Sequence, residues 1–241
     1  MDGPLQRERP DAGIEVLRLD RPAVRNALDS ATLATLTGAL AELAADPALR
    51  VLVLSTSDPR ALCAGADVAE VLDREQGLAR MAAFGRLYAA LEAFPVPTIA
   101  VCVGNCVGAG AELVAGVDLR VVGDNLRLAW AGARLGVPVG PARLVPLVGV
   151  ARAKQLVLTG RTVGPGEAVA LGLATDVVPA AQAEAAALAL AREIAVHPPE
   201  GMRELKALFR SLDGGLERVS AENAALERFQ REGPGLPQRR P

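Results

Sequence analysis

The spacing of apolar residues predicts several short strands in the first three quarters of the chain. Apolar and polar residues alternate over "GIEVLRLD" (13–20), which is typical of a half-buried strand. Two β-rich apolar runs, "VLVLST" (51–56) and "TIAVCV" (98–103), predict strands buried on both faces, as in a parallel sheet. Further short strands are expected within 118–130, at "DLRVV" and "LRLAW", and at "TDVV" before residue 179.

Helical periodicity occupies most of the remaining chain. The segment 30–46 has apolar residues at helical spacing, with Asp29 or Ser30 as a plausible N-cap and Pro47 beyond its end. A second helix is predicted over 74–94. After Gly140 the chain is mainly helical, and the expected segments are 141–148, 151–158, 166–171, 180–197, 199–212 and 215–230.

The alternation of strands and helices as far as residue 178 predicts an α/β fold. No linker separates two independent domains. We expect a flexible N-terminus over 1–13, a core over 14–180, a helical region over 181–232 and a disordered tail over 233–241. The closing helices must bury their apolar faces on the core or on another subunit.

Composition excludes several classes of function. Hydrophobic residues make up 51% of the chain, and 26 basic residues against 28 acidic ones give a net charge of −2, which offers no reason to expect nucleic-acid binding. No apolar run reaches the roughly 18 residues of a membrane span. The polar start "MDGPLQRERPDAG" lacks the apolar segment of a signal peptide, so we expect a cytoplasmic protein with no membrane partner.

Cysteine and histidine are too scarce for several kinds of site. Cys63, Cys102 and Cys106 have no CxxC spacing, and their odd number argues against a disulfide framework. The one histidine, His197, excludes a multi-histidine metal site, and its position at a predicted helix end favours a capping or solvated role over catalysis. The chemistry must therefore use carboxylates, backbone groups or cysteine.

The stretch "VGAGAEL" (107–113) places Glu112 in apolar surroundings that contain no other acid before Asp118. A buried carboxylate is costly, so Glu112 should be paired, exposed or chemically useful. The glycines fit neither GxGxxG nor a phosphate-binding loop. Small residues at a helix start instead expose backbone N–H donors of the kind that form an oxyanion hole. A second such turn is "LCAGADV" (62–68), and both turns follow predicted strands.

Four segments together resemble the enoyl-CoA hydratase/isomerase, or crotonase, family over about residues 14 to 210. Each motif alone is a modest signal, but their order and spacing make a specific one. The segments are "RNAL" (25–28), "LCAGADV" (62–68), "PTIAVCVGNCVGAGAELVAGVDLRV" (97–121) and "ARAKQLVLTGRTVGPGEAVALGLATDVV" (151–178).

The resemblance implies a spiral of ββα units that binds an acyl-CoA thioester, with 181–232 serving assembly into a homotrimer or a dimer of trimers. It implies no metal and no cofactor apart from the coenzyme A of the substrate. The thioester oxygen would lie between the N–H groups of Ala66 and Ala109, the latter preceded by Gly108. The family often has glycine where Ala109 stands, so the alanine serves only if its backbone angle tolerates a Cβ.

Further residues enter through the same resemblance. Glu112 corresponds to one of two catalytic carboxylates, and Ala64 and Asp67 lie where the family's coenzyme A path runs. For Asp67 a simple role as a helix N-terminal acid is equally plausible. Arg60 and Lys206 are candidates to meet coenzyme A phosphates, with a solvated surface role as the alternative, and 69–80 is a candidate mobile flap.

The second family carboxylate is missing. Ala131 and Gly132 stand where Pro-Glu is expected, and residues 125–166 contain no Asp or Glu. Hydration divides its proton transfers between two groups, whereas double-bond migration needs one. The nearest substitutes each have a plainer explanation. They are Trp130 (acyl-pocket wall or core packing), Arg134 (a partner for an acyl carboxylate, or a surface residue) and Cys106 (a small core residue).

The sequence therefore predicts enolate chemistry on an enoyl-CoA, either hydration or isomerisation, with Glu112 as the single remaining acid/base. The alternative is an acyl-CoA-binding protein of the same fold with weakened or lost activity, which the absent second acid favours. A scaffold without a ligand is disfavoured because both donor turns are intact.

Overall fold

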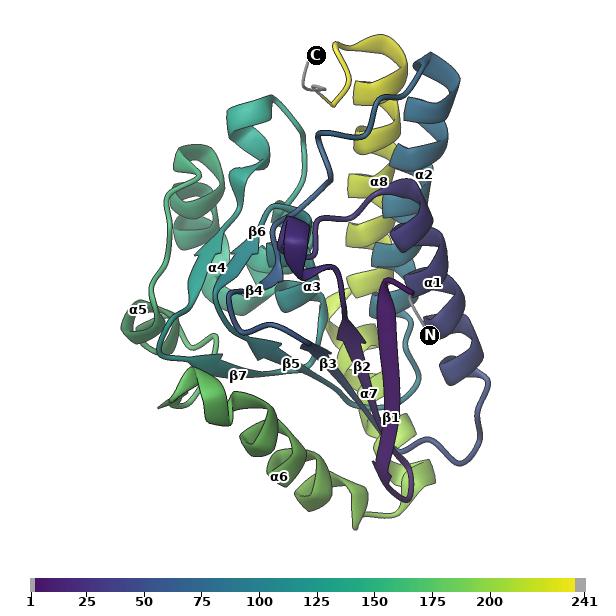
Figure 1. Ribbon diagram of the computed structural model, residues 1–241, viewed down its shortest axis with the longest axis vertical. Coiled ribbons are helices and arrows are strands. Elements are labelled where there is room, and N and C mark those ends of the chain that lie inside the picture. Colours follow the sequence, from purple (N-terminus) through teal and green to yellow (C-terminus); the bar gives the residue numbers. More distant parts are fainter. Residues whose placement is uncertain (1–2, 237–241) are drawn as a thin grey trace.

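The computed structural model describes residues 3–236 of the chain and contains two sheets (Figure 1). The larger has the strand order β1-β2-β3-β5-β7-β9, and the smaller has the order β4-β6-β8. The strands are β1 (Leu5–Asp11), β2 (Ile14–Leu19), β3 (Val51–Thr56), β4 (Ala61–Cys63), β5 (Thr98–Cys102), β6 (Asn105–Val107), β7 (Leu119–Gly123), β8 (Arg127–Ala129) and β9 (Val177–Val178). The helices are α1 (Ser30–Ala44), α2 (Arg74–Glu92), α3 (Ala109–Gly116), α4 (Pro141–Thr159), α5 (Pro165–Ala170), α6 (Ala183–Ala195), α7 (Pro199–Asp213) and α8 (Gly215–Glu232).

A ββα unit repeats through the middle of the chain. In β3-β4-α2 and again in β5-β6-α3, the first strand joins the larger sheet, the second joins the smaller sheet, and a helix follows. Neighbouring strands are parallel except for β1 and β2. The turn between β5 and β6 requires Gly104, because a Cβ there would fall 2.1 Å from the carbonyl oxygen of Arg60. The expected α/β class is confirmed, and each unit advances the chain by one strand in both sheets.

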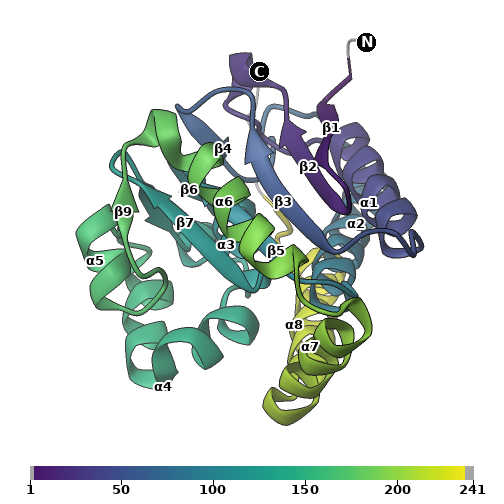
Figure 2. The same ribbon diagram turned by 90° about the horizontal axis from the view of Figure 1, so that it is seen from below.

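Apolar residues pack on both faces of the larger sheet. One face joins the smaller sheet and α1, α2, α3 and α8 in the main core. The other face is covered by α6, which lies across β3, β5 and β7 (Figure 2). On α6 the buried residues are Ala183, Ala187 and Ala191, spaced one turn apart. Their small side chains allow the helix to approach the valines and isoleucines of the sheet closely.

Several expected elements are confirmed. Helix α1 begins with Asp29 as its N-cap, whose side chain accepts a hydrogen bond from the Thr32 N–H at 2.8 Å. Helix α4 contains a non-helical residue, Gly149, with φ of +76°, which separates the two segments expected over 141–148 and 151–158. Within residues 3–236 no helix is long and apolar enough to cross a membrane.

The expectation of a flexible segment over 1–13 is wrong for residues 5–11, which form strand β1 against β2. This strand is almost entirely exposed, so it has no hydrophobic signature. Its register is fixed by charge instead. Arg7 and Arg9 each donate to the buried carboxylate of Glu15 at 2.9 Å, and they also bind Glu42 and Asp46 near α1.

Two of the three closing helices bury their apolar faces on the core, which is one of the two expected alternatives. Helix α6 covers the sheet, and α8 packs along α2 (Figure 1), so both pack within the chain, while α7 exposes a row of apolar side chains.

The candidate flap over 69–80 is helical from Arg74, with a capping box formed by Asp73 and Gln76. Of the expected disordered tail, Leu236 packs against the core, and residues 237–241 lie outside the described part.

The approach of α3 to β4 gives a test of the fold. A Cβ on Gly110 would lie 2.1 Å from the Cys63 carbonyl oxygen, so we expect Gly110→Ala to lower the free energy of unfolding by about 2 kcal/mol or more. The matched control is Gly38→Ala on the exposed side of α1, where no atom lies within 4 Å, and which should raise stability by roughly 0.5–1 kcal/mol. Urea unfolding measures both, and an equal effect of the two substitutions would contradict this packing.

Candidate active site

The two donor turns lie against each other. Gly65 has φ of +105°, and a Cβ on it would fall 2.9 Å from the Val107 carbonyl oxygen and 3.7 Å from the Ala109 nitrogen. Within residues 3–236 neither the Ala66 N–H nor the Ala109 N–H donates to a protein acceptor. Two free N–H groups are thus held at the neighbouring ends of β4 and β6, as expected for parallel strands of one sheet.

Alanine is compatible with the second donor position. Gly108, the residue before α3, takes the glycine-favouring conformation with φ of +55° and ψ of −116°. Ala109 is then the first residue of the helix and does not have a positive φ. Its Cβ is therefore tolerated, and its N–H is one of the donors that a helix start leaves unpaired.

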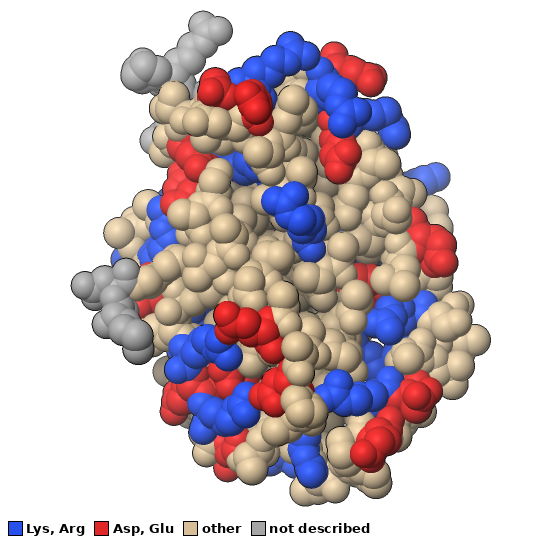
Figure 3. All heavy atoms as spheres, turned by 90° about the vertical axis from the view of Figure 1, so that its right-hand side faces the viewer, with Lys and Arg blue, Asp and Glu red and all other residues tan. Residues whose placement is uncertain are grey.

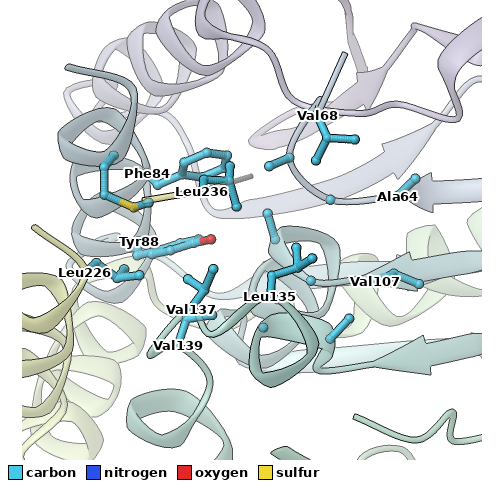
Figure 4. Close-up of a pocket in the computed structure, with 17 residues that line it drawn as sticks. Ala64, Val68, Phe84, Tyr88, Val107, Leu135, Val137, Val139, Leu226 and Leu236 are labelled. Atoms are coloured by element: carbon cyan, nitrogen blue, oxygen red, sulfur yellow. The ribbon is translucent and has the colours of Figure 1, made fainter. Parts of the chain in front are cut away.

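A cavity of about 220 Å³ opens beside these donors (Figure 4). Ala64, Ala66, Gly108 and Ala109 line it, as expected for four of the predicted site residues. The opposite walls are apolar and come from α2, the segment 135–139, α8 and the chain beyond it. These side chains are Met81, Phe84, Tyr88, Leu135, Val137, Val139, Leu226 and Leu236.

Glu112 is buried in an ion-pair cluster. Its Oε2 accepts a hydrogen bond from Arg143 Nε at 2.7 Å, and both side chains are 1% exposed. Arg143 donates from its terminal Nη2 to Glu222 of α8, and the second oxygen of Glu222 accepts from the Ala142 N–H at 2.8 Å. The Arg143 guanidinium also lies over the Tyr88 ring, 4.3 Å from its centroid. Two carboxylates thus share one arginine.

This cluster controls the protonation of Glu112. The pKa of Glu112 is raised to about 7: burial is the largest cause, the charge and hydrogen bond of Arg143 oppose it, and the charge of Glu222 adds to it. With both carboxylates ionised the cluster carries one excess negative charge, which the apolar surroundings disfavour. Glu112 can therefore hold or release a proton near neutral pH.

The free oxygen of Glu112 lies behind the cavity wall. Oε1 has no hydrogen-bond partner within residues 3–236, and neither does the indole nitrogen of Trp130. The position of a Cβ on Gly140 would be 3.4 Å from this Oε1 and 3.0 Å from Cδ1 of Trp130, so both side chains border the same glycine. Neither Glu112 nor Trp130 is among the cavity-lining residues.

The other charged candidates are engaged away from the cavity. Asp67 lies 3.4 Å from Arg21 and accepts the Ala69 N–H in a turn. It is not a helix N-terminal acid, because the next helix, α2, begins at Arg74 with Asp73 as its N-cap. Arg60 is exposed and paired with Asp58. Lys206 donates to the Val96 carbonyl and to Asp118 at 2.8 and 2.7 Å.

Two of the candidate substitutes for the missing acid are also accounted for. Arg134 donates to the Gly160 carbonyl at 2.6 Å and does not line the cavity. Cys106 is buried, which raises the pKa of its thiol, as fits a small core residue.

Three site residues escaped the sequence analysis. Tyr88 is the chain's only tyrosine and lies on a helix whose role is not visible from its periodicity. Arg143 stands out as a charge in an apolar segment. Glu222 is one of many acids on an amphipathic helix, so nothing in the sequence marks it. Within residues 3–236 no cluster of His, Cys, Asp and Glu is arranged to hold a metal ion.

Comparison with known proteins gives a consistent set of relatives. The family model described as "Enoyl-CoA hydratase/isomerase" matches residues 9–231. The 2,3-dehydroadipyl-CoA hydratase of Escherichia coli (strain K12) is 35% identical over 215 residues, covering 88% of this chain and 84% of that protein. Enoyl-CoA hydratase domain-containing protein 2 of Bos taurus is 35% identical over 228 residues, covering 90% and 76%.

Solved structures of hydratases superpose over almost the whole chain. Enoyl-CoA hydratase from Bacillus anthracis gives a TM-score of 0.83 at 26% identity, with 98% of this chain and 99% of that one covered. A putative enoyl-CoA hydratase from Streptomyces coelicolor A3(2) gives 0.81 at 31% identity, with 99% and 95% covered.

The raised pKa of Glu112 makes a prediction about stability. Between pH 4.5 and about 7 the folded protein keeps a proton on Glu112 that the unfolded chain, with a pKa of about 4.5, releases. The free energy of unfolding should therefore decrease as pH rises from 4.5 to about 7. Glu112→Gln should remove this decline in the free energy of unfolding. Urea unfolding between these pH values tests it. Glu167→Gln is the control. Arg161 lowers the pKa of the Glu167 carboxyl below 4.5, so titration of Glu167 changes the free energy of unfolding only at lower pH. The same slope in all three proteins would contradict the assignment.

Proposed function

The chain belongs to the enoyl-CoA hydratase/isomerase family, and from this premise we propose that it binds an acyl-CoA thioester and performs enolate chemistry on it, by hydration of an enoyl-CoA or by migration of its double bond. Its fold is the crotonase-like spiral of the solved enoyl-CoA hydratases. The observation that carries the proposal is the pair of unpaired N–H groups, on Ala66 and Ala109, that face one apolar cavity.

In this proposal the thioester oxygen accepts hydrogen bonds from both N–H groups. Negative charge that develops on this oxygen in the enolate is stabilised by donors already in place, and each such donor is worth about 10²–10³ in rate. The positive end of α3 adds to this stabilisation, because Ala109 is its first residue.

Glu112 would then move the proton. In double-bond migration it takes a proton from C2 of a 3-enoyl thioester and returns it at C4, so one carboxylate suffices. In hydration the water oxygen bonds to C3 and Glu112 takes the proton that this water loses. Protonated Glu112 then gives this proton to C2 of the enolate. A pKa of about 7 suits a group that must act both as base and as acid.

A second candidate is an acyl-CoA-binding protein with weak or no catalysis. It is favoured by the position of Glu112, which is ion-paired to Arg143 and lies outside the cavity lining. Catalysis requires the free Oε1 of Glu112 to reach the substrate, whereas binding alone does not.

The cavity supports an uncharged acyl chain. None of the side chains that line it is charged, and Arg134, the candidate partner for an acyl carboxylate, is engaged with Gly160. The relative from Escherichia coli is named for a dicarboxylic acyl group, and this cavity offers no counter-charge for one. We therefore propose a neutral acyl-CoA as substrate, with coenzyme A passing Ala64 and Gly108, and with Arg60 and Asp67 near its path.

We also propose that the protein assembles as a homotrimer or a dimer of trimers through α7. This helix exposes Leu205, Leu208, Phe209 and Leu212 on one face, which is unusual for a surface in contact with water. Elsewhere acidic and basic side chains are interspersed, as on the face in Figure 3, so we propose no nucleic-acid partner. Sedimentation velocity measures the assembly.

Turnover tests the proposed function. A panel of 2-enoyl- and 3-enoyl-CoA thioesters is offered to the intact protein and to Glu112→Gln, with binding measured in parallel. We expect turnover to fall by about 10²-fold or more in Glu112→Gln while binding persists. Tight binding without turnover by the intact protein would establish the binding function instead, and absence of both would refute the acyl-CoA site.

The uncharged lining predicts substrate selectivity. An enoyl-CoA with an apolar chain should bind at least about 10-fold more tightly than one of equal length that ends in a carboxylate, because the buried carboxylate would have no partner. Equilibrium titration with the two thioesters measures this ratio. Equal affinity would contradict the proposed substrate class.

A further inference from the structure

Tyr88 is the one side chain with a polar oxygen among the 17 residues that line the cavity. Figure 4 shows its hydroxyl directed toward the centre of the cavity, away from α2. The residue as a whole is 3% exposed, its oxygen opens onto the cavity, and no protein atom within residues 3–236 is its hydrogen-bond partner. A ligand that fills the cavity takes this hydroxyl out of contact with water, so an acceptor oxygen on that ligand is favoured over an apolar group.

The ring is held in place by two contacts. Phe84 packs one turn earlier on α2 with ring centroids 6.1 Å apart, and the Arg143 guanidinium lies 4.3 Å from the Tyr88 centroid. Arg143 is itself fixed by Glu112 and Glu222. The hydroxyl is therefore a preorganised group, which costs little entropy when a ligand binds it.

The hydroxyl remains a hydrogen-bond donor at neutral pH. Burial raises the pKa of Tyr88 well above its ordinary value, and the negative charge of Glu112 acts in the same direction. The other titratable groups around the ring are Arg143, which opposes this effect, and Cys63 and Glu222, which add to it. The phenol form thus persists at neutral pH.

We propose that Tyr88 determines substrate specificity by hydrogen bonding to an oxygen carried on the acyl chain near the thioester. This inference rests on the proposed function and narrows it. Hydration places an oxygen at C3, whereas double-bond migration places none, so a polar group fixed in an otherwise apolar cavity favours the hydratase class. Polar groups placed singly in apolar pockets orient ligands and select among them.

The test compares two ligands of equal chain length, 3-hydroxybutyryl-CoA and butyryl-CoA. Binding is measured by calorimetry in the Glu112→Gln background, which prevents conversion of the hydroxy ligand, with and without Tyr88→Phe. We expect the Glu112→Gln protein to bind 3-hydroxybutyryl-CoA about 3- to 10-fold more tightly than butyryl-CoA, which is the effect of one neutral hydrogen bond. Tyr88→Phe should bring this ratio to about one while the affinity for butyryl-CoA is kept.

Met81→Leu is the matched control, because Met81 lies on the same helix and in the same lining but carries no hydroxyl. It should shift the affinity for both ligands together and preserve their ratio. Two results would overturn the role of Tyr88 without refuting the acyl-CoA site. One is an affinity ratio that Tyr88→Phe leaves unchanged, and the other is equal affinity for the two ligands in the Glu112→Gln protein. Failure of both ligands to bind would overturn the acyl-CoA site and this inference together.

Discussion

The buried arginine between two carboxylates is the interaction on which the candidate site depends. Arg143 of α4 binds Glu112 of α3 and Glu222 of α8, and its guanidinium lies over Tyr88 of α2. Four helices from distant parts of the chain are thus joined at one charge. A buried cluster of this kind is weak evidence for stability, because desolvation offsets much of the attraction. Its value here is in position and protonation, since it fixes one oxygen of Glu112 and leaves the other free.

The cavity is completed by elements that have no part in the donor turns. Helix α8 and the chain beyond it supply Leu226 and Leu236, and α2 supplies the aromatic wall. Helix α8 also carries Glu222, so the packing of α8 on α2 affects the acyl wall and the charge next to Glu112 at once. The shape of the cavity and the protonation of Glu112 are therefore linked through one helix.

The missing second carboxylate has a different meaning in the folded chain than in the sequence. Between residues 125 and 166 there is no acid to divide the proton transfers of hydration. The structure brings a second carboxylate, Glu222, close to Glu112, but both of its oxygens are already bonded, so it acts on Glu112 through its charge. The group that faces the cavity is the hydroxyl of Tyr88. A single carboxylate and a phenol are thus the side-chain groups available to the proposed chemistry.

The sequence alone determined most of the strands and helices and the two donor turns. These follow from local rules: apolar spacing, helix caps, and small residues where the backbone must approach a ligand. The candidate role of Glu112 followed from the resemblance of four segments to a known family. Local rules failed at β1, which is held by arginines rather than by apolar residues, and they left open whether the closing helices pack on the core or on another subunit. Only the tertiary structure decided which charges meet Glu112 and which side chains face the cavity. Pairing between residues 112, 143 and 222 leaves no periodic signature along the chain, because its energy depends on distances that exist only after α3, α4 and α8 have packed.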